Sequence, residues 1–200
     1  MIVPAMLTGL VLAGGQARRM QAGLGTVVDK GLLDVRGEPL VAHAQRFLTP
    51  HVQTVLISAN RNAQAYAVYG EVIADDAALG DSLGPLAGVE RALAMARTPW
   101  LMVLPVDVVN VPPDLASKLL AAVDAHVAPI AYACTTERAH PLCMVLHVRL
   151  AHSLRHYLMG GDRKVQLWQD QHQAVPVVFQ GDGLFLNINT PADLDHASQC

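Results

Sequence analysis

A glycine pair followed by two arginines is the first feature of this chain that suggests chemistry. Gly14 and Gly15 end an apolar run, and Arg18 and Arg19 follow shortly afterwards. Adjacent glycines let the backbone turn sharply and present N–H groups to phosphate oxygens, and an arginine adds a charge-assisted hydrogen bond. Most glycine pairs are only turns, and this spacing matches neither the G-x-G-x-x-G fingerprint nor the P-loop. The arginines nevertheless favour a phosphate site of another kind.

Lys30 and Asp107 are the next candidates for a site of this kind. A lysine after a glycine-rich loop is most often a surface residue, but its ammonium would suit a bound triphosphate. Asp107 follows the apolar run 100–104, and Mg²⁺ prefers one or two carboxylates together with substrate phosphates; the alternative role is a helix cap or turn. We predict that Arg19 and Lys30 stabilise phosphoryl charge and that Asp107 binds Mg²⁺, or Mn²⁺ in its place.

Two further features have both a structural and a functional interpretation. Asp75 follows a short apolar segment, so it is either an ordinary loop aspartate or a contact to a base or ribose. Gly84 and Gly88 flank the start of a proline-led helix, which indicates close packing of that helix or close approach of its backbone to a ligand. His152 and His156 lie four residues apart without the glutamate of H-E-x-x-H, so we predict no metal there.

Alternating strands and helices must position these residues. We predict strands at 7–12, 52–58, 71–74, 100–104, 129–134, 142–148, 175–179 and 184–188, with an extended piece at 31–35. We predict helices at 37–48, 63–69, 85–96, 112–126, 150–158, 164–171 and 191–196. This order predicts one three-layer α/β/α, Rossmann-like domain over residues 1–200, with a mostly parallel, mixed central sheet. Ligands of such sheets bind beyond the carboxyl ends of the strands.

Composition narrows the class of protein. The chain is 52% hydrophobic and carries a net charge of −3, which suits a buried parallel sheet and argues against nucleic acid as a partner. Its three cysteines are odd in number and fit no zinc motif, which favours a reducing compartment without structural disulfides. The apolar N-terminus precedes its positive charges and is too short to span a bilayer. We therefore expect a cytoplasmic protein without a membrane segment.

A series of motifs, in order along nearly the whole chain, resembles the molybdenum cofactor guanylyltransferase family of the nucleotidyltransferase superfamily. They are TGLVLAGGQARRM at 8–20, DKGLL at 29–33, SANR at 58–61, GPLAG at 84–88, Asp107, PPDL at 112–115, HP at 140–141 and NINTP at 187–191. Each motif is modest alone, but their order and spacing are specific. The resemblance implies that the terminal phosphate of molybdenum-bound molybdopterin attacks the α-phosphate of GTP, releasing pyrophosphate and forming the guanine dinucleotide cofactor.

The resemblance also implies roles for particular residues. The expected GTP-binding residues are Leu12, Ala13, Gly14, Gly15, Lys30, Ser58, Asn60, Asp75, Gly84 and Asp107. The expected residues on the pterin side are His140, Arg163, Asn187 and Asn189. The N-terminal half would then bind the nucleotide and the C-terminal half the molybdopterin. We expect a monomer that makes transient contacts with a molybdenum insertase, an accessory GTPase and molybdoenzyme chaperones.

Three departures from the family pattern keep other functions open. Residues 21–28 lengthen the phosphate loop, Ser58 stands where the family often has asparagine, and Val108 and Val109 replace a polar–proline pair. The alternatives are a cytidylyltransferase for the same cofactor, a nucleotidyltransferase for sugar or polyol phosphates, and a nucleotide sensor or assembly protein without catalysis. An NAD-dependent dehydrogenase is a poor alternative, because the required glycine spacing is missing.

Overall fold

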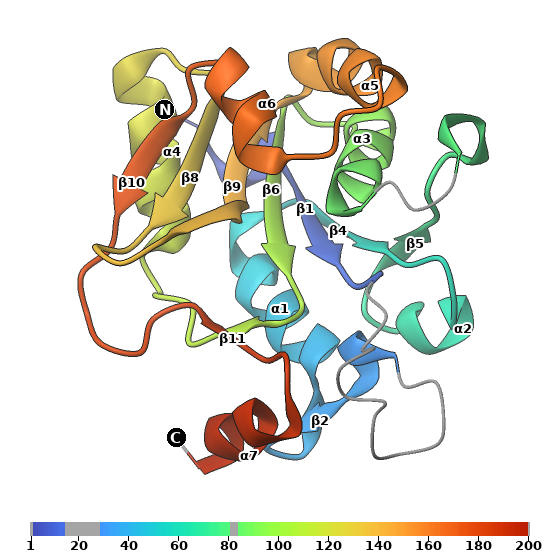
Figure 1. Cartoon of the computed structure of the whole chain (residues 1–200), viewed down its shortest axis with the longest axis vertical. Coiled ribbons are helices and arrows are strands. Elements are labelled where there is room, and N and C mark those ends of the chain that lie inside the picture. The colour runs from blue at the N-terminus through green and yellow to red at the C-terminus, as the bar shows by residue number, and fades with distance from the viewer. Residues whose placement is uncertain (1, 15–28, 81–83, 200) are drawn as a thin grey trace.

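A central mixed sheet runs through the computed structural model, which describes residues 2–14, 29–80 and 84–199 (Figure 1). Its strand order is β10 (Val175–Val178), β8 (Ile130–Cys134), β9 (Ala139–His147), β6 (Trp100–Pro105), β1 (Leu7–Leu12), β4 (Thr54–Ser58) and β5 (Glu71–Ile73). Only β9 runs antiparallel to its neighbours in this sheet. The carboxyl ends of the other strands and the start of β9 therefore share one edge.

Helices cover both faces of this sheet. The helices of the described residues are α1 (Leu40–Leu48), α2 (Ala63–Tyr66), α3 (Pro85–Met95), α4 (Leu115–His126), α5 (Ala151–Met159), α6 (Val165–Gln171) and α7 (Pro191–Gln199), of which α7 packs against β2 (Asp34–Val35) and not against this sheet. One buried cluster joins the sheet to α1 and α4, and a second joins it to α3, α5 and α6. The predicted α/β/α layers and mostly parallel sheet are confirmed. In the part of the chain that the structure describes, no helix is both long and apolar enough to cross a membrane.

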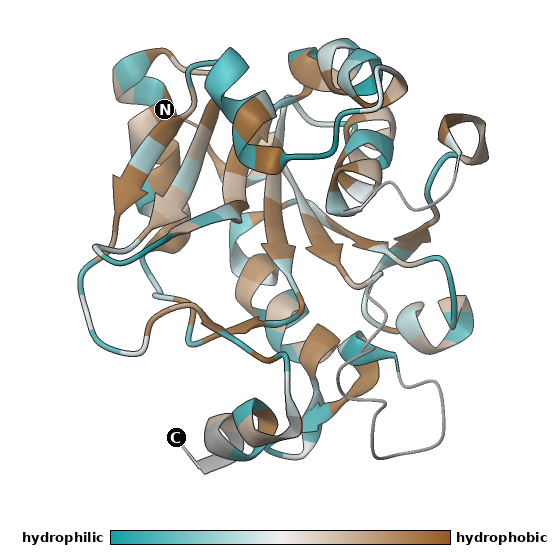
Figure 2. Ribbon diagram, viewed as in Figure 1, coloured by the Kyte–Doolittle hydropathy of each residue, from teal (hydrophilic) through white to brown (hydrophobic). Residues whose placement is uncertain are grey.

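The strands form because their side chains are apolar on both faces. In β1, Leu10 packs into the α3 cluster and Val11 into the α1 cluster, and both are completely buried. Strands buried on both faces are typical of parallel sheets between helices, and Figure 2 shows their hydrophobic colouring in the middle of the fold. Leu40, Ala44 and Leu48 recur at helical spacing and form the buried stripe of α1.

Several predicted boundaries were wrong. The strand expected at 184–188 is only β11 (Leu186–Asn187), and it pairs outside the main sheet with β7 (Val108–Val109), which we had not predicted. The piece expected to be extended at 31–35 contains a 3-10 turn at Lys30–Leu32 before β2 (Asp34–Val35), which pairs with β3 (Glu38–Pro39). The fourth helix begins at Leu115 rather than at the prolines, because a residue that precedes proline disfavours helical backbone.

Strand β9 begins earlier than predicted, at Ala139, and contains Pro141. Its pairing with β8 shifts register, since Tyr132 pairs with Met144 whereas Ala133 pairs with His140. Proline cannot donate a ladder hydrogen bond and is tolerated where a strand bulges. The register shift lies near the start of β9, at the edge where the other strands have their carboxyl ends.

Candidate active site

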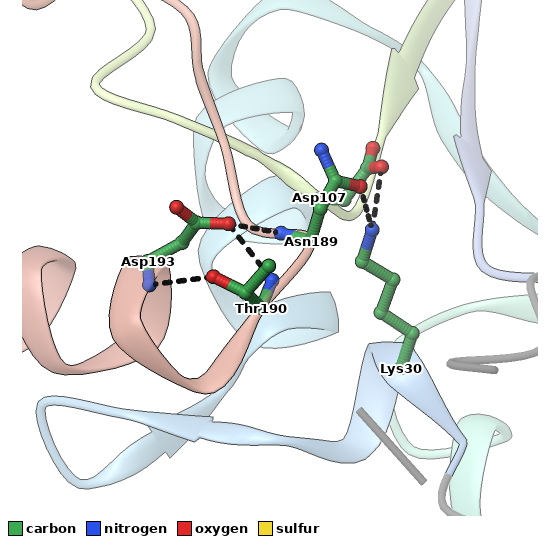
Figure 3. A network of polar contacts seen from close by, with 5 residues as sticks. All are labelled: Lys30, Asp107, Asn189, Thr190 and Asp193. Carbon is green, nitrogen blue, oxygen red and sulfur yellow. Dashed lines mark hydrogen bonds and ion pairs between the residues drawn. The ribbon is translucent and has the colours of Figure 1, made fainter. Parts of the chain in front are cut away.

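Lys30, Asp107 and Asn189 meet at the carboxyl edge of the sheet. Lys30 Nζ donates to Asp107 Oδ2 at 2.8 Å and to Asn189 Oδ1 at 2.9 Å, and the three side chains point toward one another in Figure 3. The Lys30 side chain is only 12% exposed, and that of Asp107 is 29% exposed. Two oxygen atoms of the protein thus already converge on one cation.

The carboxylate of Asp107 also fits Mg²⁺, whose preferred protein ligands are hard oxygen donors. Within residues 2–14, 29–80 and 84–199, no group of three His, Cys, Asp or Glu side chains is arranged to hold a metal. A metal at Asp107 would therefore take further ligands from phosphates and water, as Mg²⁺ commonly does. The prediction that Asp107 binds Mg²⁺ remains a prediction with a suitable donor set.

The backbone around Lys30 is fixed by a buried contact to α2. Tyr66 donates its hydroxyl proton to Asp29 Oδ1 at 2.7 Å, and Asn62 Nδ2 donates to Asp29 Oδ2 at 3.1 Å. Burial and the hydrogen bond to Asp29 raise the pKa of Tyr66, so the phenol stays protonated. A Cβ at Gly31 would lie 2.5 Å from the Tyr66 hydroxyl oxygen. Gly31 is therefore required for Tyr66 to reach Asp29, and Asp29 is the residue directly before Lys30.

A cavity of about 220 Å³ opens beside Lys30, and we call it the Lys30 cavity. Its walls come from the ends of β1, β4 and β6, the loop after β5 and the start of α3. The lining residues are Leu12, Gly14, Lys30, Ser58, Asp75, Gly84, Pro85, Gly88, Pro105, Val106, Asp107 and Leu142. The fold thus brings together in one cavity most of the residues that the sequence assigned to nucleotide binding.

Helix α3 approaches β4 very closely at Gly88. A Cβ at this position would lie 2.2 Å from Ser58 Oγ and 2.9 Å from Ser58 Cβ. Gly84 adopts a φ of 71° immediately before the helix. Gly88 therefore serves close packing, and both glycines also line the Lys30 cavity, so contact between this backbone and a ligand stays a prediction.

The remaining nucleotide candidates lie around this cavity or outside the described residues. Asn60 Nδ2 donates to Asp75 Oδ2 at 2.8 Å, and the Asp75 N–H donates to Asn60 Oδ1 at 2.9 Å. Ala13 is completely buried, and its N–H donates to the Ser58 carbonyl at 2.9 Å. Asn60 and Ala13 thus brace residues of the cavity wall. Gly15 and Arg19 lie outside the described residues, as do residues 21–28 of the long loop.

A second cavity of about 220 Å³, which we call the His140 cavity, adjoins the first. It is lined by Pro105, Asp107, Val108, Ala139, His140, Pro141, Leu142, Cys143 and Asn187. Three of these residues, Pro105, Asp107 and Leu142, also line the Lys30 cavity. Asp107 therefore stands on the wall between two cavities, which suits a reaction that joins two molecules.

His140 is the buried polar group of this second cavity. It is 6% exposed, its ring stacks on Phe185 with centroids 4.6 Å apart, and its Nε2 lacks a hydrogen-bond partner among the described residues. Burial, helped by the positive charge of Arg138, lowers the pKa of His140 to about 4. His140 is thus a neutral imidazole near pH 7, with a buried and unpartnered ring nitrogen beside this cavity.

The segment after β11 is tied to the backbone of Asp107. Asn187 pairs with Val108 in the short β7–β11 ladder, and the Ile188 N–H donates to the Asp107 carbonyl at 2.8 Å. The valines that depart from the family pattern thus form the strand that holds this segment. The two asparagines predicted on the pterin side lie in different places: Asn187 lines the His140 cavity, whereas Asn189 contacts Lys30.

Arg163 lies apart from these contacts. Its Nη1 donates to the carbonyls of Leu158 and Asp162, both at 2.6 Å, at the end of α5. It is not among the residues that line the Lys30 or the His140 cavity. Its role on the pterin side stays a prediction without support from the structure.

The sequence analysis gave no role to Asp29, Arg155 or Asp193. Arg155 Nη1 donates to Asp76 Oδ2 at 2.9 Å and to Glu90 Oε1 at 2.8 Å, which ties α5 to α3 and to the loop after Asp75. Arg155 carries no sequence signal, because its partners are far along the chain, and Asp29 appears in the sequence only as the first residue of the DKGLL motif. Asp193 does carry a sequence signal, because a threonine followed three residues later by an acidic residue is typical of a helix start.

Comparisons with known proteins show the family of this chain. The sequence profile described as the MobA-like NTP transferase domain matches residues 9–175. A protein of Yersinia pseudotuberculosis named molybdenum cofactor guanylyltransferase is 41% identical over 190 residues, which cover 94% of this chain and 93% of that protein. One of the same name from Shewanella amazonensis is 36% identical, and the match covers 96% of each chain.

Solved structures show the same fold. The molybdopterin-guanine dinucleotide biosynthesis protein A of Archaeoglobus fulgidus superposes with a TM-score of 0.76 at 22% identity, covering 96% of this chain and 97% of that chain. A nucleotidyl transferase from Methanothermobacter thermautotroptrophicus superposes with a TM-score of 0.70 at 19% identity, covering 97% of this chain and 98% of that chain.

Proposed function

This chain belongs to the molybdenum cofactor guanylyltransferases, within the MobA-like NTP transferases, and from that premise we propose that it transfers GMP from GTP to molybdenum-loaded molybdopterin. The chain is a nucleotidyltransferase of molybdenum cofactor biosynthesis. In the proposed reaction, the terminal phosphate of the pterin forms a bond to the α-phosphorus of GTP. The bond to the β-phosphate breaks, and pyrophosphate leaves with its electron pair.

The observation that carries the proposal is the position of Asp107 between two adjoining cavities. The Lys30 cavity holds the nucleotide candidates, and the His140 cavity holds His140 and Asn187. We assign GTP to the first cavity and the phosphate end of molybdopterin to the second. Two reactants held on either side of one carboxylate react without the entropic cost of a bimolecular encounter. The residues that line the His140 cavity all follow Trp100, whereas most of those that line the Lys30 cavity precede it, which supports a nucleotide-binding N-terminal half and a pterin-binding C-terminal half within one domain.

Charge stabilisation is the main task of the residues in this site. Phosphoryl transfer concentrates negative charge on oxygens, and fixed cations and N–H groups lower the barrier when they already point at those oxygens. Lys30 is held in such a place by Asp107 and Asn189. Bound together with GTP at Asp107, Mg²⁺ would neutralise phosphate charge. Arg19, which precedes Lys30 in the sequence, is our second candidate for stabilising the same charge.

Asp75 is our candidate for recognising the guanine base or its ribose. Asp75 lines the Lys30 cavity, and its carboxylate accepts a hydrogen bond from Asn60 Nδ2 while its backbone N–H donates to Asn60 Oδ1. A carboxylate accepts hydrogen bonds from adjacent N–H groups or hydroxyls, and guanine carries two such N–H groups on one edge. Cytosine lacks that pair, so this pocket supports GTP over CTP.

The setting of the reaction follows from the family and from composition. We propose that the protein is cytoplasmic, because an odd number of cysteines without a zinc motif suits a reducing compartment. We also propose that it acts as a monomer. Transient contacts with a molybdenum insertase, an accessory GTPase and molybdoenzyme chaperones are part of the same proposal. They would deliver the pterin and accept the finished cofactor.

The test supplies the purified protein with Mg²⁺, molybdenum-loaded molybdopterin and each of the four ribonucleoside triphosphates in turn. Pyrophosphate release and the nucleotide attached to the pterin are both measured. Asp107→Ala is run alongside, with Glu71→Ala as a matched control because Glu71 is an exposed carboxylate on edge strand β5. We expect product from GTP alone, loss of it in Asp107→Ala and full activity in Glu71→Ala.

Other outcomes would point to the alternative functions. Product from CTP would identify a cytidylyltransferase for the same cofactor. Transfer to a sugar or polyol phosphate, but not to molybdopterin, would move the acceptor to another class. Tight GTP binding without pyrophosphate release under any condition would refute catalysis and favour a nucleotide sensor.

A further inference from the structure

Asp193 carries a charged side chain at the start of α7, directly behind the cluster of Lys30, Asp107 and Asn189 (Figure 3). Its Oδ2 accepts the N–H of Thr190 at 2.8 Å and the N–H of Asn189 at 2.9 Å. In return, the Asp193 N–H donates to Thr190 Oγ1 at 3.2 Å. These reciprocal bonds between Thr190 and Asp193 form a capping box, a common way to begin a helix.

The bond to Asn189 goes beyond what a helix start requires. A capping box uses the N–H of the cap residue, here Thr190, whereas Asn189 precedes the helix and belongs to the site. The backbone hydrogen bonds and the charge of nearby Lys30 lower the pKa of Asp193, so the carboxylate is ionised near pH 7. An ionised acceptor makes shorter and stronger bonds to N–H groups than a neutral one.

Asn189 is thereby held from two sides. The Ile188 N–H donates to the Asp107 carbonyl at 2.8 Å, which fixes the backbone before Asn189, and Asp193 fixes the N–H of Asn189 itself. From this anchored backbone, Asn189 Oδ1 accepts a hydrogen bond from Lys30 Nζ at 2.9 Å. A continuous series of contacts runs from α7 through Asn189 to the Lys30 ammonium and Asp107.

We propose that Asp193 is a positioning residue: it holds Asn189 so that the amide oxygen keeps the Lys30 ammonium beside Asp107, in place for the phosphates. This inference rests on the proposed function, because it concerns the same site. Helix α7 would then help to align the charges of Lys30 and Asp107, which line the cavity assigned to GTP. This role also explains why a segment 159 residues away from Lys30 in sequence is anchored so firmly.

The capping box supplies a matched control. Thr190→Ala removes the hydroxyl that caps α7 but leaves both bonds that Asp193 accepts, including that from Asn189. Asp193→Ala removes those two bonds, whereas Asp193→Glu keeps a carboxylate at a position where capping boxes usually carry glutamate. Thermal melts of the full-length variants identify any that fail to fold.

We would measure kcat and KM for GTP, together with a readout that does not depend on turnover. That readout is the rate at which Lys30 is reductively methylated in the nucleotide-free protein, followed by mass spectrometry. Loss of a residue that supports a site from behind typically lowers activity by about 10–100-fold. We expect Asp193→Ala to lower kcat at least about tenfold and to speed methylation of Lys30, while Asp193→Glu and Thr190→Ala stay close to wild type.

A double-mutant cycle with Asn189→Ala tests whether Asp193 acts through Asn189. If it does, adding Asp193→Ala to Asn189→Ala changes kcat and Lys30 methylation little further, because coupled residues are not additive. Equal losses in Thr190→Ala and Asp193→Ala, or additive effects in the cycle, would show that Asp193 only caps the helix. Absence of pyrophosphate release from the wild type would count against the proposed function, while the methylation rates would still decide the role of Asp193.

Discussion

Replacing Gly88 by alanine should destabilise the fold and weaken GTP binding together. The added Cβ would lie 2.2 Å from Ser58 Oγ, 2.9 Å from Ser58 Cβ and 3.1 Å from Leu12 Cδ2. Rotation of the Ser58 side chain relieves only the first of these contacts. Helix α3 cannot retreat freely, because Leu86 and Val89 on the same helix are completely buried against the sheet.

The size of the effect follows from two opposing terms. Overpacking a core costs about 1–3 kcal/mol, while alanine has a helix propensity better than that of glycine by about 1 kcal/mol. Because two contacts would be shorter than 3.0 Å, the upper part of the first range applies. We expect a net loss of about 1–2 kcal/mol, which lowers Tm by about 2–8 °C in a chain of this size. The KM for GTP should rise, since Gly88, Ser58 and Leu12 all line the Lys30 cavity.

Thermal unfolding and steady-state kinetics measure both effects. Gly160→Ala is the matched control, because a Cβ there lies 3.4 Å from its nearest neighbour and φ is −68°; we expect a change within about 0.5 kcal/mol. Ser58→Gly removes both short contacts, so the two substitutions together should be less destabilising than their sum, by about 1 kcal/mol. A Gly88→Ala variant as stable as wild type, with a strictly additive double variant, would refute the packing argument.

Three further changes test other parts of the structure. Tyr66→Phe removes a hydrogen bond to the buried carboxylate of Asp29, so we expect a loss of about 1.5–3 kcal/mol in chemical denaturation and a lower kcat; unchanged values in both would contradict the anchoring role. Arg155→Met leaves the buried carboxylate of Glu90 without its cation and should lower the free energy of unfolding by about 2–4 kcal/mol. The double variant with Glu90→Leu should recover much of that stability, and a double variant as unstable as Arg155→Met would contradict this reasoning. Because the pKa of His140 is lowered to about 4, the unfolded state binds the extra proton below about pH 6.5. Stability is therefore lost as pH falls from about 6.5 toward 4, by up to about 3 kcal/mol. His140→Phe should flatten the plot of stability against pH in this range, and an identical slope in the wild type and the variant would disprove the role of His140.

Much of the fold was predictable because its patterns are local. The apolar runs of β1 and β6 and the stripe of α1 mark strands and helices within windows of a few residues, whatever lies elsewhere in the chain. The alternation of these elements then fixed the layer arrangement and placed Gly14, Asp75 and Asp107 on one edge of the sheet. The predicted starts of α4 and β9 were wrong, because one proline precedes another at the first and the strand bulges at the second. Such details of the backbone leave no trace in the periodicity of the sequence.

The sequence by itself therefore determined the strands, the helices and the edge of the sheet at which a phosphate ligand would bind. Only the tertiary structure decided that Lys30 turns toward Asp107, that Asn189 completes the cluster and that two cavities meet there. Such contacts join residues far apart along the chain, and many pairings of loops at one sheet edge are compatible with the same local pattern. Which of them forms depends on the pairing of β7 with β11, on buried bonds such as that between Tyr66 and Asp29, and on the close fit of Gly88 against Ser58.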